Sequence, residues 1–475
     1  MATHASDNST RSDDRADFKG GSKLFGIGAT MGAIGLVAAL ALGFSGTSVL
    51  RPFLFGYLAA YMFVLVLALG SLAFVLLQHL TRAAWSVGVR RTAENFAATL
   101  PVLAVFALPI ILSVAFLNGG LYRWALPMSR ATPQDIAAAD KSEAELEEGG
   151  SADLEKTSPI IPLTAQAETD EAYKEFAAPS DPAKFTLDPL VLMKRNYGLH
   201  WLNPWFFILR LIVYFACWIG IARWYRQLSV EQDKSGNDKL SLLMQTRAAP
   251  CLVILGLTMT GAAFDLLMSL DPHWYSTMFG VVYIANSFVG SYALLIIAVY
   301  LLQKFGYLQQ SITREHFHDL GKYLFGFTFF YGYVFFAQYM LMWYANIPEE
   351  TEWMARHGAS TSIWNGWNNV ILIILFCHIL IPFAGLLSRF PKRRPNLLVF
   401  WAVWQFVFVA VDMYWMVMPE IGATGPVFIN IAINVCAAVG LLGVLIAAYG
   451  KIASTAALRP THDPRLPDSL VFENI

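Results

Sequence analysis

The chain has 475 residues, of which 56% are hydrophobic and only 14% are charged. Soluble domains carry about 25% charged residues, so this chain lacks the polar surface that a water-soluble protein of its length needs. Its net charge of −1 at pH 7 also argues against a nucleic-acid-binding surface. The composition therefore predicts a polytopic membrane protein.

Apolar segments long enough to cross about 30 Å of hydrocarbon recur along the chain. They are continuously apolar and do not alternate with polar residues, which favours helices over a β-barrel. A polar tail (1–23) precedes the first segment, and a second tail (451–475) follows the last one. We predict an all-α polytopic membrane protein with ten transmembrane helices, near residues 24–44, 53–78, 96–117, 203–223, 249–270, 278–303, 323–346, 364–388, 396–418 and 426–449.

Glycine and proline positions make local predictions for the first and third spans. Gly28 and Gly32 form a G-x-x-x-G pattern in the first span, with Gly35 beyond them, and this spacing lets another helix approach closely. Pro101 and Pro109 should kink the third span, because proline cannot donate the helical hydrogen bond.

The connecting loops predict the orientation of the chain. The loops after spans 2, 4, 6 and 8 hold fifteen Lys and Arg residues in them or at their edges, whereas the short loops on the other side hold only Arg51 and Arg356. Because basic residues concentrate on the cytoplasmic side, both termini should be cytoplasmic.

The segment 118–202 is then one long periplasmic loop between spans 3 and 4. Its centre is rich in Asp, Glu, Ala, Ser and Pro, with the acidic run EAELEEGG at 143–150. This composition is typical of a solvated flexible loop. A docking surface for an extrinsic partner is the other interpretation.

Spans 5 and 9 share a motif near their predicted periplasmic ends. An Asp follows Ala plus an apolar residue and precedes Pro by seven positions, as Asp265 before Pro272 and Asp412 before Pro419. An even offset of four spans implies a parallel repeat, with spans 2–5 matched to spans 6–9 and flanked by spans 1 and 10.

Three ionisable residues lie at one predicted depth within the membrane. Asp265 and Asp412 each lie about 10 Å below the periplasmic face, and Arg210 lies seven residues into span 4 from the same face. An isolated charge at such a depth is costly, so we expect the three groups to form one buried cluster. Its role is either an ion pair that stabilises the bundle or a protonatable site, since a desolvated carboxyl group can exchange a proton near neutral pH. His273, in the adjacent D-P-H-W-Y loop, could relay protons at the membrane face.

Further polar residues could extend a proton path across the bundle. Tyr331 and Tyr339 lie near one face of span 7, and His378 lies near the middle of span 8. His79 and Glu94 lie at the cytoplasmic ends of spans 2 and 3. Separate hydrogen bonds between helices explain each of these residues equally well.

The sequence predicts no redox cofactor or metal bound by this chain itself. None of its four cysteines forms a C-x-x-C pair, so thiolate metal sites and covalent haem attachment have no support. His79 lies at the cytoplasmic end of a span, whereas His378 lies about 15 Å from that face, so the two cannot ligate one haem.

The ten-span layout, the repeat and two strings closely resemble one family, the polysulfide-reductase-type (NrfD-like) membrane subunits. The strings are SLDPHWYSTMFG at 269–280 and MWYANIPEETEW at 342–353. Within that family, the chain resembles the second such subunit (the F subunit) of bacterial alternative complex III, over about residues 20–455.

The resemblance implies a subunit of a quinol:electron-acceptor oxidoreductase in a respiratory or photosynthetic electron-transport chain of the bacterial inner membrane. The implied partners are a sister NrfD-like membrane subunit, a periplasmic iron–sulfur subunit, and multihaem and monohaem cytochromes c, which would hold the iron–sulfur clusters and haem c. The quinol or menaquinol site of the complex is usually assigned to the sister subunit, so quinol contact by this chain stays open. The resemblance also implies proton conduction, along a path that Asp265, Asp412, His79 and His378 could form.

Two other functions fit the sequence. A proton-coupled secondary transporter also uses repeats and intramembrane carboxylates. A purely structural membrane subunit would need its polar groups only for packing.

The predicted topology can be tested by thiol labelling. In the variant Ser151→Cys, the new thiol should react with an impermeant reagent in intact spheroplasts, because the 118–202 loop is predicted to be periplasmic. Labelling that occurs only after lysis would reverse the orientation.

Overall fold

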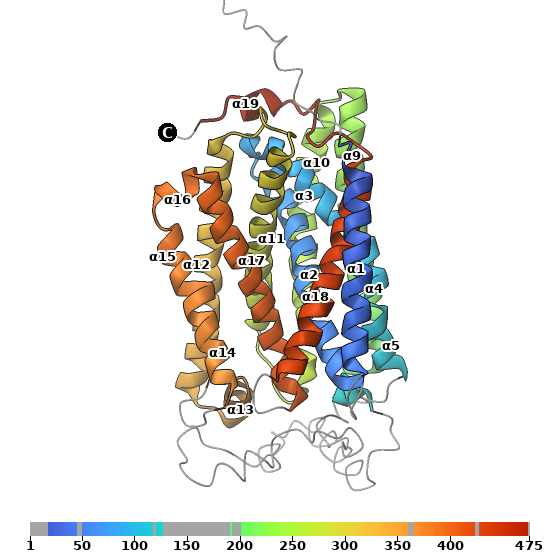
Figure 1. Ribbon diagram of the computed structural model, residues 1–475, viewed down its shortest axis with the longest axis vertical. Coiled ribbons are helices and arrows are strands. Elements are labelled where there is room, and N and C mark those ends of the chain that lie inside the picture. Colours follow the sequence, from blue (N-terminus) through green and yellow to red (C-terminus); the bar gives the residue numbers. More distant parts are fainter. Residues whose placement is uncertain are drawn as a thin grey trace, which may run out of the picture.

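In the computed structural model, the described part of the chain is helical and contains no strand. This part comprises residues 18–44, 50–116, 120–126, 191, 201–359, 365–422 and 427–473. Ten helical segments within it are long and apolar enough to cross a membrane, and they stand side by side as one bundle (Figure 1). The predicted all-α polytopic membrane fold is therefore confirmed. The 118–202 loop and its acidic centre lie almost entirely outside the described residues.

The ten spans are made of the following elements. The first three are α1 (Gly21–Gly43), α2 (Leu50–Leu80), and a broken third span of η1 (Ala84–Ser86), α3 (Val87–Ala97), α4 (Leu100–Phe106) and α5 (Leu108–Phe116). The next four are α9 (Pro204–Ser235), α10 (Lys239–Leu266) with η6 (Met268–Leu270), α11 (Phe279–Lys304) and α12 (Arg314–Ala345). The last three are α14 (Trp367–Ile373) with η7 (Ile374–Leu380) and α15 (Ile381–Leu386), α17 (Pro395–Val417) with η8 (Met418–Ile421), and α18 (Phe428–Ala453).

Short helices lie between or beyond the spans. They are η2 (Arg123–Ala125), α13 (Pro348–Arg356), α16 (Arg389–Arg393) and α19 (Leu466–Leu470). Because Gly21 of α1 packs against Gly450 of α18, the start of the first span and the end of the last one lie together. We call this end of the bundle the terminal face, and the opposite end the distal face; Figure 1 shows α19 at the terminal face and α13 at the distal face.

Spans 4 and 5 are longer than predicted. Helix α9 continues to Ser235, and α10 begins at Lys239, whereas the apolar runs predicted an end near 223 and a start near 249. Both helices extend beyond the apolar stretch through polar residues. At its distal end, α9 is capped by Asn203, whose side chain accepts a hydrogen bond from the Trp205 backbone N–H.

Helices α2 and α11 form the centre of the bundle, and their neighbours agree with the repeat. In α2, 94% of the most apolar window is buried, compared with 22% in α1. Helix α2 packs against α3 and α10 as α11 packs against α12 and α17. Likewise, α10 contacts α11 as α17 contacts α2. These matched contacts are those expected of two similar bundles, spans 2–5 and spans 6–9.

The flanking spans 1 and 10 pack closely on each other, as the glycine pattern predicts. A Cβ built on Gly28 would lie 2.5 Å from the backbone nitrogen of Ala447, and one on Gly35 would lie 2.5 Å from that of Gly440. Only glycine permits such a distance between two helix backbones. Helix α18 in turn packs against α2, which holds the pair on the side of the bundle.

Span 8 contains a π-helical segment, η7, that the sequence analysis did not predict. Pro382, four residues after His378, has no N–H to donate to the preceding turn. Side chains of α17 take over two carbonyl groups of that turn: Gln405 Nε2 donates to the His378 oxygen at 3.2 Å, and Trp404 Nε1 donates to the Cys377 oxygen at 2.6 Å. Because no water is available in hydrocarbon, these bonds allow the interruption.

The C-terminal tail packs across the terminal face instead of extending freely. Asp463 forms an ion pair with Arg90 of α3, and the Thr461 backbone N–H donates to Asp233 of α9 at 2.7 Å. Ser469 Oγ donates to the Trp85 carbonyl at 3.0 Å. Burial alone would raise the pKa of Asp463, but the charge and hydrogen bond of Arg90 outweigh burial and lower it. The tail thereby ties several spans together at this end.

The α1–α18 contact predicts a contrast between two nearby glycines. Gly28→Leu forces the helices apart, because the added side chain meets the backbone of α18. We expect a loss of about 1–3 kcal/mol or more, measured by thermal unfolding of the purified protein in detergent. Gly26→Leu is the control, because a Cβ at Gly26 has no neighbour within 4 Å. Equal stability of the two variants would contradict the close packing.

Candidate functional site

Arg210 and Asp265 form a buried ion pair between α9 and α10. The guanidinium donates two parallel hydrogen bonds to the carboxylate, from Nε at 2.8 Å and Nη2 at 2.7 Å. Tyr214 Oη donates to the same carboxylate at 3.0 Å. The ring of Trp201 covers the guanidinium at 4.1 Å. Two hydrogen bonds from a cation and one from a phenol therefore compensate the charge of this carboxylate, while an aromatic ring covers the guanidinium.

Asp412 lies in a different environment inside the second bundle. Its side chain is fully buried. Asn286 Nδ2 of α11 donates to one carboxylate oxygen at 2.5 Å, and Tyr331 Oη of α12 donates to the other at 2.8 Å. Within the described residues, no Lys or Arg side chain forms an ion pair with it. The second carboxylate of the repeat is therefore held by neutral groups only.

Hydrogen bonds extend from Asp412 through the interior of the second bundle. Asn286 Oδ1 lies 3.3 Å from Nε2 of His378, and the His378 ring packs against Tyr331 at 4.6 Å between centroids. Beyond His378, Gln405 Nε2 bonds both the His378 carbonyl and Thr328 Oγ1, the latter at 2.8 Å. We call this set, Asp412, Asn286, Tyr331, His378, Gln405 and Thr328, the Asp412 network. It takes side chains from all four spans of the second bundle.

The expectation of one cluster containing Arg210, Asp265 and Asp412 is wrong. Arg210 pairs with Asp265, whereas Asp412 bonds Asn286 and Tyr331. Similar depth along the membrane normal does not place groups side by side, and the repeat puts one carboxylate in each bundle. The expectation that one Asp balances Arg210 while the other stays unpaired is confirmed, with Asp265 as the paired residue.

A third group of charged side chains lies at the distal face. Arg356, at the end of α13, forms ion pairs with Asp271, which follows η6, and with Glu420 in η8 at 3.1 Å. Burial by itself raises the pKa of Asp271, but Arg356 and His273 outweigh burial, so the pKa lies well below its usual value. Asp271 precedes Pro272 and Glu420 follows Pro419, so Arg356 joins the ends of the two repeated motifs.

Arg356 and Glu420 were not predicted from the sequence as site residues. One signal was present: Arg356 is one of only two basic residues in the short distal loops. His273 lies at the edge of this group, with Nδ1 3.5 Å from Asp271 and its side chain 43% exposed. It contacts neither Asp265 nor Asp412 directly. Its role as a proton relay stays a prediction.

The remaining predicted path residues lie in separate places. Glu94 is buried between Arg90 at 3.4 Å and Arg91 at 2.9 Å, near the terminal face. His79 packs against the Tyr225 ring, at 5.4 Å between centroids. Neither residue is hydrogen-bonded to the Asp412 network, so a path through them stays a prediction.

Tyr339 lies apart from the Asp412 network and lines a groove on the outside of α12. Tyr331 and His378, in contrast, both lie within that network. Asn286 was not singled out in the sequence, because an Asn flanked by Ala and Ser in an apolar helix gives no recognisable pattern.

The described residues contain no group of three or more His, Cys, Asp or Glu side chains arranged to hold a metal ion. That this chain binds no redox cofactor itself stays a prediction. Comparison with protein-family models and with curated proteins found no match.

The distal charge group predicts a pH-dependent defect in an Arg356 variant. In the native protein, the lowered pKa of Asp271 contributes stability above the ordinary Asp pKa of about 4, and this contribution is lost as the pH falls through the folded-state pKa. Arg356→Gln removes the cation that pairs with both buried carboxylates and leaves only the more distant charges of Arg51 and Arg123 near Glu420, so we expect a loss of about 3 kcal/mol at neutral pH. Because protonation removes the unpaired charges, the variant should regain part of this loss as the pH falls toward about 5.

Thermal unfolding of the purified protein between about pH 5 and pH 8 measures this effect. Arg223→Gln is the matched control, because Arg223 is exposed on α9 and forms no ion pair in the described structure. A stability difference between wild type and Arg356→Gln that does not shrink on acidification would refute the electrostatic explanation.

Proposed function

We propose that this chain is the proton-transferring membrane subunit of a quinol:electron-acceptor oxidoreductase of the alternative complex III type. The observation that carries the proposal is Asp412, a fully buried carboxyl group held by Asn286 and Tyr331 without a cationic partner. An ionised carboxylate in such a place is costly, whereas its protonated form is not. A group of this kind can take up a proton and release it again.

Each member of the Asp412 network has a role in this proposal. Tyr331 and Asn286 hold the two carboxyl oxygens and orient them. His378 lies beyond Asn286 and supplies a second group that can accept and donate a proton. Gln405 fixes the backbone of the π-helical turn that carries His378. Asp265 has no part in the transfer, because Arg210 compensates its charge.

The resemblance supplies the reaction that would drive this proton movement. Oxidation of a quinol releases two electrons and two protons, and the electrons need metal centres. In the proposed complex these centres are the iron–sulfur clusters and haem c of the partner subunits, while this chain handles protons and anchors the assembly in the bacterial inner membrane. Both termini would be cytoplasmic, which places the Asp412 end of the network nearer to the periplasm.

One observation favours the alternative of a proton-coupled transporter. Span 8 is interrupted by η7 near its middle, and broken helices form the substrate sites of many transporters. Two facts oppose this interpretation. The carbonyl groups freed in η7 are bonded by Gln405 and Trp404, and the matching span of the first bundle, α9, is an unbroken helix.

Two aspartate variants test the proposal within the assembled complex. Asp412→Asn keeps a neutral hydrogen-bonding group of similar shape, so we expect normal assembly but quinol-driven turnover at least about tenfold slower. Asp265→Asn leaves Arg210 buried without its partner, and we expect it to reduce the amount of assembled subunit. Asp412→Glu restores the carboxyl group and should recover part of the turnover.

Infrared difference spectroscopy separates a proton carrier from a structural residue. The carbonyl stretching band of a protonated carboxylic acid should change during turnover in wild type and be absent in Asp412→Asn. Unchanged turnover of Asp412→Asn in an intact complex would favour the purely structural subunit.

A further inference from the structure

A pocket opens between span 7 and the start of span 3, near the terminal face. Its volume is about 510 Å³, and it is lined by Trp85 of η1 and by one side of α12. The lining residues of α12 are Asp319, Lys322, Tyr323, Gly326, Phe327 and Phe330. The pocket thus follows α12 for about 16 Å at 1.5 Å per residue.

The pocket has an open centre and an aromatic floor that other elements hold in place. A Cβ built on Gly326 would meet no other part of the described structure within 4 Å. Trp85 and Tyr323 stack on each other at 5.8 Å between ring centroids, and Tyr323 stacks in turn on Tyr292 of α11 at 5.2 Å. The C-terminal tail fixes η1 from above, because Ser469 donates to the Trp85 carbonyl. The shape of the pocket is therefore set by packing within the protein.

The lining is charged at one end and apolar at the other. Asp319 and Lys322 form an ion pair at the terminal end. Phe327 and Phe330 lie about 8 Å and 12 Å further along the helix axis, and Phe330 is 37% exposed. The apolar run that predicts span 7 begins near residue 323. The ion pair therefore lies at the depth of lipid head groups, and the two rings lie at the depth of acyl chains.

The ion pair offers a ligand one cation and one anion side by side. The Lys322 side chain is 46% exposed, and its ammonium can donate three hydrogen bonds, so it can bind a phosphate while it stays beside Asp319. The Asp319 carboxylate can accept from an ammonium group next to that phosphate. Trp85 and Tyr323 add aromatic rings, whose faces attract the same ammonium. The two charges match a head group in which a phosphate is joined to a primary amine.

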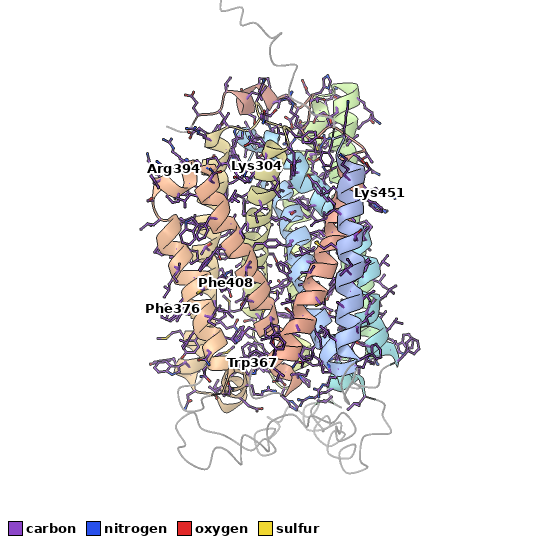
Figure 2. The ribbon with its side chains drawn as sticks, viewed as in Figure 1. Lys304, Trp367, Phe376, Arg394, Phe408 and Lys451 are labelled. Carbon is purple, nitrogen blue, oxygen red and sulfur yellow. The ribbon has the colours of Figure 1, made fainter. Side chains whose placement is uncertain are left out.

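Basic side chains gather at this end of the bundle, as Figure 2 shows for Lys304, Arg394 and Lys451. Lys392 packs on another side of α12, where a Cβ built on Gly321 would lie 2.9 Å from its Cγ. None of these four basic residues is among those that line the pocket. They attract phosphate head groups in general. The selection between head groups is left to Asp319 and Lys322.

We infer that this pocket binds phosphatidylethanolamine, with the lipid phosphate at Lys322 and the lipid ammonium at Asp319. The acyl chains pass Phe327 and Phe330 into the bilayer. A phospholipid without an amine, such as phosphatidylglycerol, places no cation beside Asp319, and a soluble phosphate ester buries nothing against the two rings. The inference is independent of the proposed function, because no member of the Asp412 network lines the pocket.

Photolabelling of the full-length protein in phosphatidylcholine nanodiscs tests this site. The probe is phosphatidylethanolamine with a diazirine on one acyl chain, close to the ester, and labelled peptides are identified by mass spectrometry. We expect labels within 319–330 and in the peptide that contains Trp85. Excess unlabelled phosphatidylethanolamine should displace the probe, whereas phosphatidylglycerol of the same chain length and free glycerophosphoethanolamine should not.

Two glycines provide matched variants. Gly326→Trp fills the centre of the pocket without meeting another part of the described structure, and it should reduce labelling about tenfold or more. Gly26→Trp in α1 is the control, because Gly26 is also exposed, has equally open surroundings and follows Lys23 by three residues as Gly326 follows Lys322 by four. Thermal unfolding of both variants checks that they are folded.

Asp319→Asn tests the choice of head group separately from the shape of the pocket. This variant keeps a hydrogen-bonding group but loses the anion that selects the amine, so phosphatidylglycerol should displace the probe as well as phosphatidylethanolamine does. The measured quantity is a ratio between two lipids on one protein, so it does not depend on how much of the protein is folded.

Three results would overturn the inference. The first is equal labelling of Gly326→Trp and Gly26→Trp, which would mean that the probe binds outside the pocket. The second is displacement by phosphatidylglycerol from the wild-type protein as effective as that by phosphatidylethanolamine, because the amine would then have no role. The third is displacement by glycerophosphoethanolamine, which would identify the ligand as a soluble phosphate ester.

Discussion

The cost of charge in hydrocarbon organises this bundle. Away from water, an ionised side chain needs an opposite charge and hydrogen bonds at close range, and three arginine-centred groups meet that need at three levels. Arg210 neutralises Asp265 within the first bundle, Arg356 joins Asp271 to Glu420 at the distal face, and Arg90 binds Asp463 of the tail at the terminal face. The latter two groups tie together segments that are far apart in the chain. Asp412 differs from these carboxylates, because only neutral groups bond it among the described residues. A buried ionisable group in such surroundings is a candidate for proton chemistry.

The repeat explains both the similarity and the difference between the two buried carboxylates. Matched spans place Asp265 and Asp412 at corresponding positions, each at the distal end of a helix that packs on the central pair α2 and α11. The surrounding residues have diverged. In the first bundle, α9 supplies a guanidinium, whereas in the second bundle, span 8 supplies His378 through Asn286. One framework thus holds a closed ion pair on one side and a protonatable group on the other.

The extent to which sequence predicted this structure follows from the physics of each signal. Continuous apolar runs, glycine spacing and proline positions act locally, and they predicted the ten spans, the close contact of α1 with α18 and the breaks of span 3. Depth along the membrane also follows from counting residues, but lateral position does not, and so Asp412 was wrongly grouped with Arg210. Arg356 and Glu420 lie 64 residues apart in the chain, and nothing local links them. Likewise, nothing local links Gln405 of α17 to the His378 carbonyl of span 8. Gln405 bonds this carbonyl because Pro382 has no N–H to donate to it.

The π-helical turn of span 8 connects the Asp412 network with the groove that Tyr339 lines on the outside of α12. Pro382 removes one helical hydrogen bond, and Gln405 and Trp404 hold the turn open from α17. That turn directs His378 toward Asn286 inside the bundle, while Leu375 and Ile379 of the same turn form the groove wall outside it. Both faces of the turn depend on bonds from one helix, α17, which also carries Asp412.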